Sequence, residues 1–129
     1  MSIYICMEEV VLLRIGEFIA LTGTTKDTIR HYEDLDLIMS KGPDGKRIYT
    51  EQHLADYFAI QELKSYGVKL RDIQSIFKLK RSYGCGHAKL IKEVGESLNL
   101  LLDGLRQEEL ELRNRIQMLE RLVQQIAEI

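Results

Sequence analysis

Residues 14–35 read RIGEFIALTGTTKDTIRHYEDL, and this stretch decides the fold. Apolar side chains recur at helical spacing up to Gly23, a residue that readily takes the left-handed conformation in which many helices end. A second apolar series follows, and Thr24 or Thr25 can cap its start. Its members are Ile29, Tyr32 and Leu35, at intervals of three. Two short helices joined by a glycine turn predict a helix-turn-helix.

A turn with two flanking apolar runs predicts a small β-hairpin after the second helix. The turn is Gly42-Pro43-Asp44-Gly45, which contains the single proline of the chain and is its strongest turn signal. The runs are Leu37-Ile38-Met39 before the turn and Arg47-Ile48-Tyr49 after it. Because such runs around a short turn are typical of paired strands, we expect a two-stranded wing.

Two further helices are predicted after the hairpin. Thr50 can act as an N-cap, and the apolar face that follows it ends at Gly67. A shorter amphipathic helix then begins near Leu70 and is broken by the small residues at 82–86. The apolar positions are Leu54, Tyr57, Phe58, Ile60, Leu63 and Tyr66 in the first helix, and Leu70, Ile73, Ile76 and Phe77 in the second. We therefore predict a mostly α fold, with a winged helix-turn-helix headpiece at residues 13–81 and a linker turn at residues 82–86.

Residues 87–129 have the pattern of one long dimerisation helix. They contain no proline, and an apolar residue recurs every seven positions, as in a coiled coil. The seam consists of Ile91, Leu98, Leu105, Leu112, Leu119 and Ile126, with a companion row at Val94, Leu101, Ile116 and Val123. A helix of ~40 residues is ~60 Å long, which is more than the headpiece can cover. A second copy of the chain is the simplest partner, and the alternative is a helix folded back on its own headpiece.

Composition and charge narrow the class of protein. The net charge of −2 argues against a generally basic nucleic-acid coat protein, although residues 64–81 carry six basic side chains and one acid. No apolar run reaches the ~20 residues of a membrane helix, and the first residues lack a secretory signal, so we expect a cytoplasmic protein without membrane contact. No phosphate-binding glycine loop, nucleophile elbow or recognisable pair of catalytic acids occurs, so we expect neither catalytic residues nor a cofactor.

The second helix and the hairpin present side chains suited to duplex DNA. An α-helix fits the major groove, and a hairpin tip can hold the sugar-phosphate backbone beside it. Ile29 and Tyr32 would face inward and leave the polar side chains outside. The candidate contacts are Lys26, Thr28, Arg30 and His31 on the helix, and Lys46 and Arg47 near the hairpin tip.

Five short segments carry a family resemblance. They are RIGEF at 14–18, TG at 22–23, TIRHYE at 28–33, RIY at 47–49 and LKSYGV at 63–68. Together they resemble the MerR family of bacterial transcription regulators over residues 13 to about 81, with the long helix in its proper place afterwards. Three positions depart from the family pattern. His31 stands where tyrosine is usual, Lys46 where an aromatic residue is frequent, and Asp36 where glycine is usual.

The resemblance implies an antiparallel coiled-coil homodimer that places two headpieces on a pseudo-palindromic promoter site. The dimer would bend and untwist the DNA so that RNA polymerase, an indirect partner, engages both promoter elements; part of the specificity would then come from DNA deformation. Carried over by position, the DNA contacts would be Thr25, Lys26, Arg30, His31 and Tyr32 on the second helix, Arg47 and Tyr49 in the wing, and Lys64 on the third helix.

Cys85-Gly86-His87, at the expected start of the long helix, is the one reactive group of residues that we identify. The helix dipole would favour a thiolate there, as an oxidation or electrophile sensor requires. A metal site would need Cys85, His87 and further ligands from the partner chain. Metal-sensing members of the family carry additional cysteines after the dimer helix and this chain does not, so we assign no metal. The third interpretation is a plain turn that contains a small apolar residue.

Two other functions stay open from the sequence. An architectural or excision-type DNA-bending protein would use the same headpiece without an effector. A coiled-coil adaptor would show no salt-dependent binding to duplex DNA of any sequence.

Overall fold

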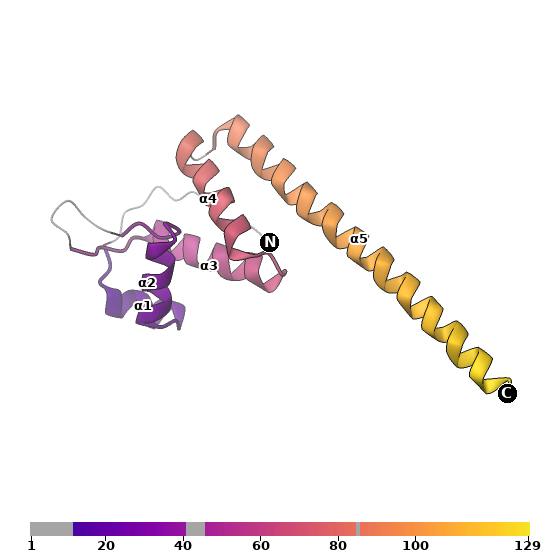
Figure 1. Cartoon of the computed structure of the whole chain (residues 1–129). Helices are drawn as coiled ribbons and strands as arrows, with labels where there is room; N and C mark the ends of the chain where they lie inside the picture. The colour runs from indigo at the N-terminus through magenta and orange to yellow at the C-terminus, as the bar shows by residue number, and fades with distance from the viewer. Residues whose placement is uncertain (1–11, 41–45, 85) are drawn as a thin grey trace. The chain divides into compact units, whose positions relative to one another are not determined.

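A computed structural model of the chain describes residues 12–40, 46–84 and 86–129. These residues form five helices (Figure 1). They are α1 (Ile15–Thr22), α2 (Lys26–Asp34), α3 (Glu51–Ser65), α4 (Leu70–Tyr83) and α5 (Ala88–Ala127). The chain divides into two compact units, Met1–Ile91 and Lys92–Ile129. We call the first unit the headpiece and describe each unit by itself.

The helix-turn-helix forms where the local signals predict it. α1 ends at Gly23, whose φ of 69° is left-handed and whose amide donates to the carbonyl of Ile19. α2 begins after Thr25, whose hydroxyl accepts a hydrogen bond from the amide of Thr28 at 3.2 Å. The predicted turn and the second of the two predicted caps are therefore confirmed.

α3 begins with a reciprocal cap between Thr50 and His53. The Thr50 hydroxyl accepts from the amide of His53, and the Thr50 amide donates to Nδ1 of His53 at 3.0 Å. Because Nδ1 accepts, the neutral ring carries its proton on Nε2, which lies 3.0 Å from the carbonyl oxygen of Met39 and can donate to it. Burial lowers the pKa of His53 below the usual value of 6.5. The start of α3 is thus joined to the segment that follows α2.

The segments expected to form the wing make some backbone pairing, but no strand forms among the described residues. Leu13 and Tyr49 form an isolated antiparallel bridge, with hydrogen bonds of 2.7 and 3.0 Å in the two directions. The amide of Ile48 donates to the carbonyl of Ser40 at 2.8 Å, so the two expected arms do meet. The predicted tip at residues 42–45 lies outside the described residues. A two-stranded wing therefore stays a prediction.

The core of the headpiece is built around α3, which contacts α1 and α4. Aromatic side chains from separate segments meet there. The ring centroids of Phe18 and Tyr49 lie 4.8 Å apart, and Tyr57 packs 6.2 Å from both Phe18 and Tyr32. The largest fully buried side chains are Phe18, Ile29, Tyr32, Ile38, Tyr49, Ile60 and Ile73.

The apolar face expected for α3 is wrong at two positions. Phe58 and Tyr66 are 51% and 56% exposed, whereas Asp56 and Ala59 are buried. α3 is covered by different neighbours on different sides, so burial follows those neighbours and not the apolar stripe alone. Asp56 is buried because Lys80 of α4 forms an ion pair with it at 2.9 Å and Gln52 donates to it at 2.9 Å.

The second unit is the greater part of α5. The whole helix has 40 residues, which corresponds to about 60 Å. Its apolar side chains stay open to solvent in the single chain: Leu105, Leu112, Leu119 and Ile126 are 52%, 51%, 62% and 69% exposed. None of the helices formed by the described residues combines the length and apolar character needed to cross a membrane. The predicted boundary at residues 82–86 stays a prediction. The headpiece unit itself continues to Ile91, and Leu90 in the first turn of α5 is buried.

Candidate nucleic-acid interface

α2 presents a polar outer surface and a buried inner one. Ile29 and Tyr32 are 0% and 1% exposed, as the helical spacing predicted. Lys26, Arg30 and His31 are exposed on the same helix. Among the described residues, Lys26 and Arg30 form no hydrogen bond or ion pair through their side chains, so both are available to another molecule.

Thr25 and Thr28 serve first as the cap of α2. Their hydroxyl oxygens lie 2.9 Å apart, and the Thr25 hydroxyl also accepts from the Thr28 amide. Thr25 is exposed and Thr28 is partly exposed. These hydroxyls therefore lie at the start of α2, where they hold the end of the helix.

The hydroxyl of Tyr32 joins α2 to α3. It accepts hydrogen bonds from Nε2 of Gln61 at 2.9 Å and from Nζ of Lys64 at 3.3 Å. Nζ of Lys64 also lies 5.9 Å from the centre of the Tyr32 ring, within the range of a cation–π contact. Lys64, far away in sequence, is thereby brought next to the predicted recognition helix.

Glu33 joins α2 to the wing through three interactions. Its Oε1 accepts from the Tyr49 hydroxyl at 2.6 Å and from the Ser40 hydroxyl at 2.8 Å, and its Oε2 pairs with Nε of Arg47 at 2.9 Å. Only 9% of the Glu33 side chain is exposed. Burial, together with the hydrogen bond to this carboxylate, raises the pKa of Tyr49 to about 12. We call Glu33, Ser40, Arg47 and Tyr49 the wing anchor.

Glu33 has no role among the contacts predicted from the sequence. It is one of three acids in α2, and nothing in its helical position reveals that Arg47 and Tyr49 contact it. The signal that could have found it is chemical. An acid on the buried side of the helix needs partners, and the arm at residues 47–49 supplies a cation and a phenol.

Two of the side chains predicted to contact DNA are buried in the chain. Tyr32 is 1% exposed and Tyr49 is 0% exposed, because both rings belong to the aromatic core. Their hydroxyls hold Lys64 and Glu33 instead. The side chains of Lys46, Arg47 and Lys64 have exposed surface. Arg47 uses Nε for Glu33, and a guanidinium has four further N–H donors on its terminal nitrogens.

The structure therefore brings three elements together. α2 carries Lys26 and Arg30, and the wing anchor and the Tyr32 hydroxyl attach Arg47 and Lys64 to adjacent residues of that helix. Exposed cations therefore gather around α2, which also carries the exposed acids Asp27 and Asp34, and phosphate groups of duplex DNA are ligands that such cations bind.

The predicted sensor is only partly described. Cys85 lies outside the described residues, as does Cys6. His87 is exposed, its ring centroid lies 5.8 Å from that of Tyr83, and its Nδ1 accepts from the amide of Lys89 at 3.1 Å. No group of three or more His, Cys, Asp or Glu residues that could hold a metal ion occurs within the described part of the chain. The redox interpretation of Cys85 and His87 stays a prediction.

Comparison with known proteins gives one match. The family of MerR HTH regulatory proteins matches residues 13–80, which is more than half of the 129 residues and includes every element of the interface described above. The comparisons find no significant match among curated proteins or among solved structures. Because the match spans both the helix-turn-helix and the elements that hold the wing and Lys64 against it, the chain belongs to the MerR family of helix-turn-helix regulatory proteins.

Proposed function

We propose that the protein is a transcription regulator that binds duplex DNA as a homodimer, with α2 of each copy in a major groove. Its membership in a family of helix-turn-helix regulators supports the DNA-binding role. The observation that carries the proposal is the arrangement of cations around α2. Lys26 and Arg30 lie on its outer surface without a partner among the described residues, and partly buried contacts hold Arg47 and Lys64 beside it.

The proposed contacts divide by chemistry. Arg30 and His31 would read base edges or anchor the helix, and Thr25, Lys26 and Thr28 would bind near the start of α2. Lys46, Arg47 and Lys64 would hold phosphates, which contributes affinity without sequence information. In this proposal Tyr32 and Tyr49 act as positioning residues, because their buried hydroxyls orient Lys64 and, through Glu33, Arg47.

The proposed dimer uses the apolar seam of α5. Ile91, Leu105, Leu112, Ile116, Leu119, Val123 and Ile126 are between 47% and 69% exposed in the single chain, and Val94, Leu98 and Leu101 complete the seam with partial exposure. An antiparallel pairing of two such helices would bury both seams. It would also fix the distance between two headpieces, which a two-half-site operator requires. Distortion of the DNA between the half-sites, with RNA polymerase as the indirect partner, belongs to the same proposal.

The test is a footprint on the DNA upstream of the gene for this chain, combined with binding measurements at several salt concentrations. We expect one protected site with two half-sites, and the logarithm of the binding constant should fall linearly with the logarithm of the salt concentration. If the site lies inside a promoter with an overlong spacer, the protein is a regulator. A site away from any promoter would favour the architectural DNA-bending protein. An absence of salt-dependent binding would contradict both functions.

A further inference from the structure

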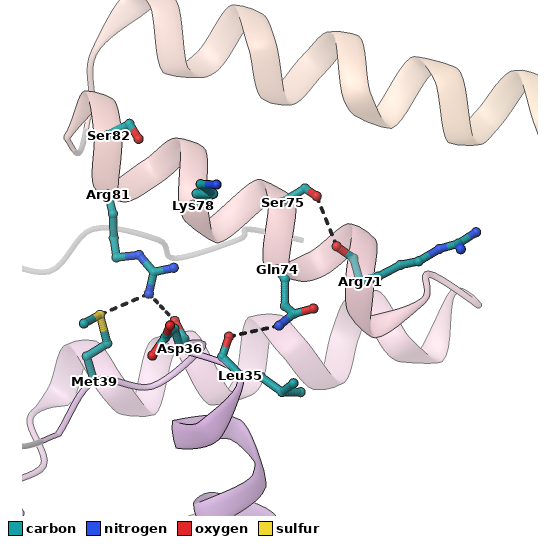
Figure 2. Close-up of a pocket in the computed structure, with 9 residues that line it drawn as sticks. All are labelled: Leu35, Asp36, Met39, Arg71, Gln74, Ser75, Lys78, Arg81 and Ser82. Carbon is teal, nitrogen blue, oxygen red and sulfur yellow. Dashed lines mark hydrogen bonds between the residues drawn. The ribbon is translucent and has the colours of Figure 1, made fainter.

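A groove lies in the headpiece between α4 and the loop that follows α2 (Figure 2). Its cavity has a volume of about 650 Å³. Sites for small molecules are typically ~300–1,000 Å³ in volume, so the groove has the size of a ligand site. None of the groups proposed above to contact DNA lines it.

One wall of the groove is a single face of α4. Positions 71, 74, 75, 78, 81 and 82 line it, and their spacing of three and four residues places them on one side of the helix. The core contacts of α4 come from other positions, where Ile73, Ile76 and Phe77 are buried. The apolar core contacts of α4 therefore lie outside the groove face.

This wall is cationic. Arg71, Lys78 and Arg81 line it, and Asp36 is the one acid among the described lining residues. Arg71 and Lys78 are exposed, and their side chains form no hydrogen bond or ion pair within the described part of the chain. Arg71 also lies in the first turn of α4, where the helix dipole disfavours a cation. A bound anion would stabilise both groups, to which the described residues offer no partner.

The opposite wall is the loop that leads from α2 to the wing, and α4 holds it directly. Nη1 of Arg81 donates to the carbonyl of Asp36 and lies 3.0 Å from the sulfur of Met39, as Figure 2 shows. Nε2 of Gln74 donates to the carbonyl of Leu35 at 3.1 Å. Leu35 and Met39 give this wall an apolar surface, and Met39 is 60% exposed. The groove thus combines a cationic wall with a partly apolar one.

We propose that this groove is an effector site for a small molecule that carries a phosphate group and an apolar portion. A guanidinium group can donate two parallel hydrogen bonds to two oxygens of one phosphate, and an ammonium group adds a mobile point charge. Arg71, Lys78 and Arg81 would hold the phosphate, and the apolar portion would lie against Leu35 and Met39. A DNA backbone fits less well, because the cations border a hollow whose second wall is partly apolar.

Binding in the groove would reach the DNA-binding elements through Arg81. A phosphate that takes the Arg81 guanidinium competes with the Asp36 carbonyl and the Met39 sulfur, so the described part of the loop after α2 would be left with the hydrogen bond from Gln74. We expect the ligand to change the affinity for DNA in this way. This consequence rests on the proposed function, whereas binding of the ligand does not.

The first experiment is calorimetric titration of the full chain, without DNA and at constant ionic strength, with phenyl phosphate as the probe. Phenyl phosphate should bind more tightly than inorganic phosphate, because of its ring, and more tightly than benzoate, because of its phosphate. The variant R71Q/K78Q should bind phenyl phosphate at least about tenfold more weakly. The variant K92Q/R106Q makes the same change of charge on α5 and should bind as the natural chain does, and so should R30A.

Three outcomes would overturn the proposal. The first is that phenyl phosphate does not bind the natural chain. The second is that R71Q/K78Q binds it as well as K92Q/R106Q does, and the third is that benzoate binds equally well. The substituted side chains are exposed, and circular dichroism checks that each variant is folded. If the natural chain does not bind duplex DNA, the proposed function fails and the titration can still be interpreted.

Hydrogen exchange tests whether ligand binding acts on the loop through Arg81. DNA-binding measurements test whether DNA, and not a small molecule, occupies the groove. Phenyl phosphate should speed hydrogen exchange at the amides of Leu37 and Ile38, which donate to the carbonyl of Tyr32, and unchanged exchange would contradict the route. R71Q/K78Q should keep its affinity for duplex DNA and its salt dependence. A loss of DNA affinity with a shallower salt dependence would instead make the groove a DNA contact and would overturn the effector site.

Discussion

The headpiece and α5 differ in the exposure of their apolar side chains. The headpiece buries Phe18, Ile29, Tyr49 and Ile60 completely within one chain. α5 leaves the side chains of its seam about half exposed or more over its C-terminal half. A domain that has buried its core can be stable alone, whereas a long helix with an open apolar stripe depends on packing against something else.

The polar interactions of the headpiece and of α5 also differ in how far they are exposed to solvent. The headpiece contains a buried carboxylate with three partners and a buried ion pair between Asp56 and Lys80. In α5, the ion pair between Arg113 and Glu109 has both side chains well exposed, and such pairs contribute little to stability. The headpiece is thus specified by contacts within one chain, whereas the apolar stripe of α5 stays exposed within one chain and, in our proposal, is covered by a second copy.

The largest effect is expected from a variant that disrupts the apolar seam of α5. Replacement of Leu105 and Leu112 by Asp should abolish the dimer, because two buried carboxylates per helix would face an apolar partner. Affinity for a two-half-site operator should then fall by about 100-fold or more, since the two headpieces would no longer bind as one unit. Sedimentation measures the dimer and gel-shift titration measures the affinity.

The matched control is the variant Q107D/N114D. It introduces the same two acids seven residues apart on the same helix, but away from the seam. It should stay dimeric and bind as the natural chain does. A dimeric L105D/L112D would show that the chains pair elsewhere.

The next largest effect is expected from a variant that removes Glu33 from the wing anchor of the headpiece. Glu33→Ala leaves the Tyr49 and Ser40 hydroxyls without their acceptor in a buried place, and we expect a loss of about 3 kcal/mol of unfolding free energy. DNA affinity should fall too, since Arg47 loses its orienting partner. Urea denaturation measures the stability. Glu17→Ala, which removes an exposed acid of α1, should cost less than about 0.5 kcal/mol.

Arg30 separates function from stability within the headpiece. Arg30→Ala should weaken DNA binding by about 1–3 kcal/mol and leave both the unfolding free energy and the dimer unchanged, because the side chain is exposed and unpaired. Titration of the operator and urea denaturation measure the two quantities. Arg106→Ala on α5 removes an equally exposed cation and should leave DNA affinity as it is. Equal affinity for the Arg30 variant would remove this residue from the interface.

Asp36 tests the cost of one backbone conformation. Its φ of 58° is left-handed, which explains why glycine suits this position. Asp36→Gly should raise the unfolding free energy by up to about 1 kcal/mol, because a side chain strains that conformation. Ala20→Gly, at an exposed position inside α1, should lower it by about the same amount. Equal signs for the two variants would contradict this explanation.

The smallest expected effect is a pH dependence that arises from His53. Burial lowers its pKa, so the unfolded chain takes up a proton at a higher pH than the folded chain does. The contribution of the neutral ring is fully present above pH 6.5 and is lost as the pH falls below that value toward the lower pKa of the folded state. His53→Gln keeps an acceptor for the Thr50 amide without titrating. Its unfolding free energy should therefore change less between pH 7.5 and 5.5 than that of the natural chain, and identical pH profiles would contradict the assignment.

Local sequence patterns were sufficient for the helices and their ends. Gly23, Thr25 and Thr50 act on neighbours within four residues, so their roles could be predicted without knowledge of the fold. The seven-residue repeat of α5 is likewise a property of one helix. The spacing of α2 also predicted that Ile29 and Tyr32 face inward.

Only the tertiary structure decided which distant groups meet. Glu33 contacts Ser40, Arg47 and Tyr49, and Lys64 contacts Tyr32, because packing of α3 and of the wing arm brings these segments to α2. The exposure of Phe58 and the burial of Asp56 likewise depend on which neighbours cover α3. A pattern along the chain reports the period of one element, whereas burial and polar contacts depend on every element around it, and that information is not contained in any single segment.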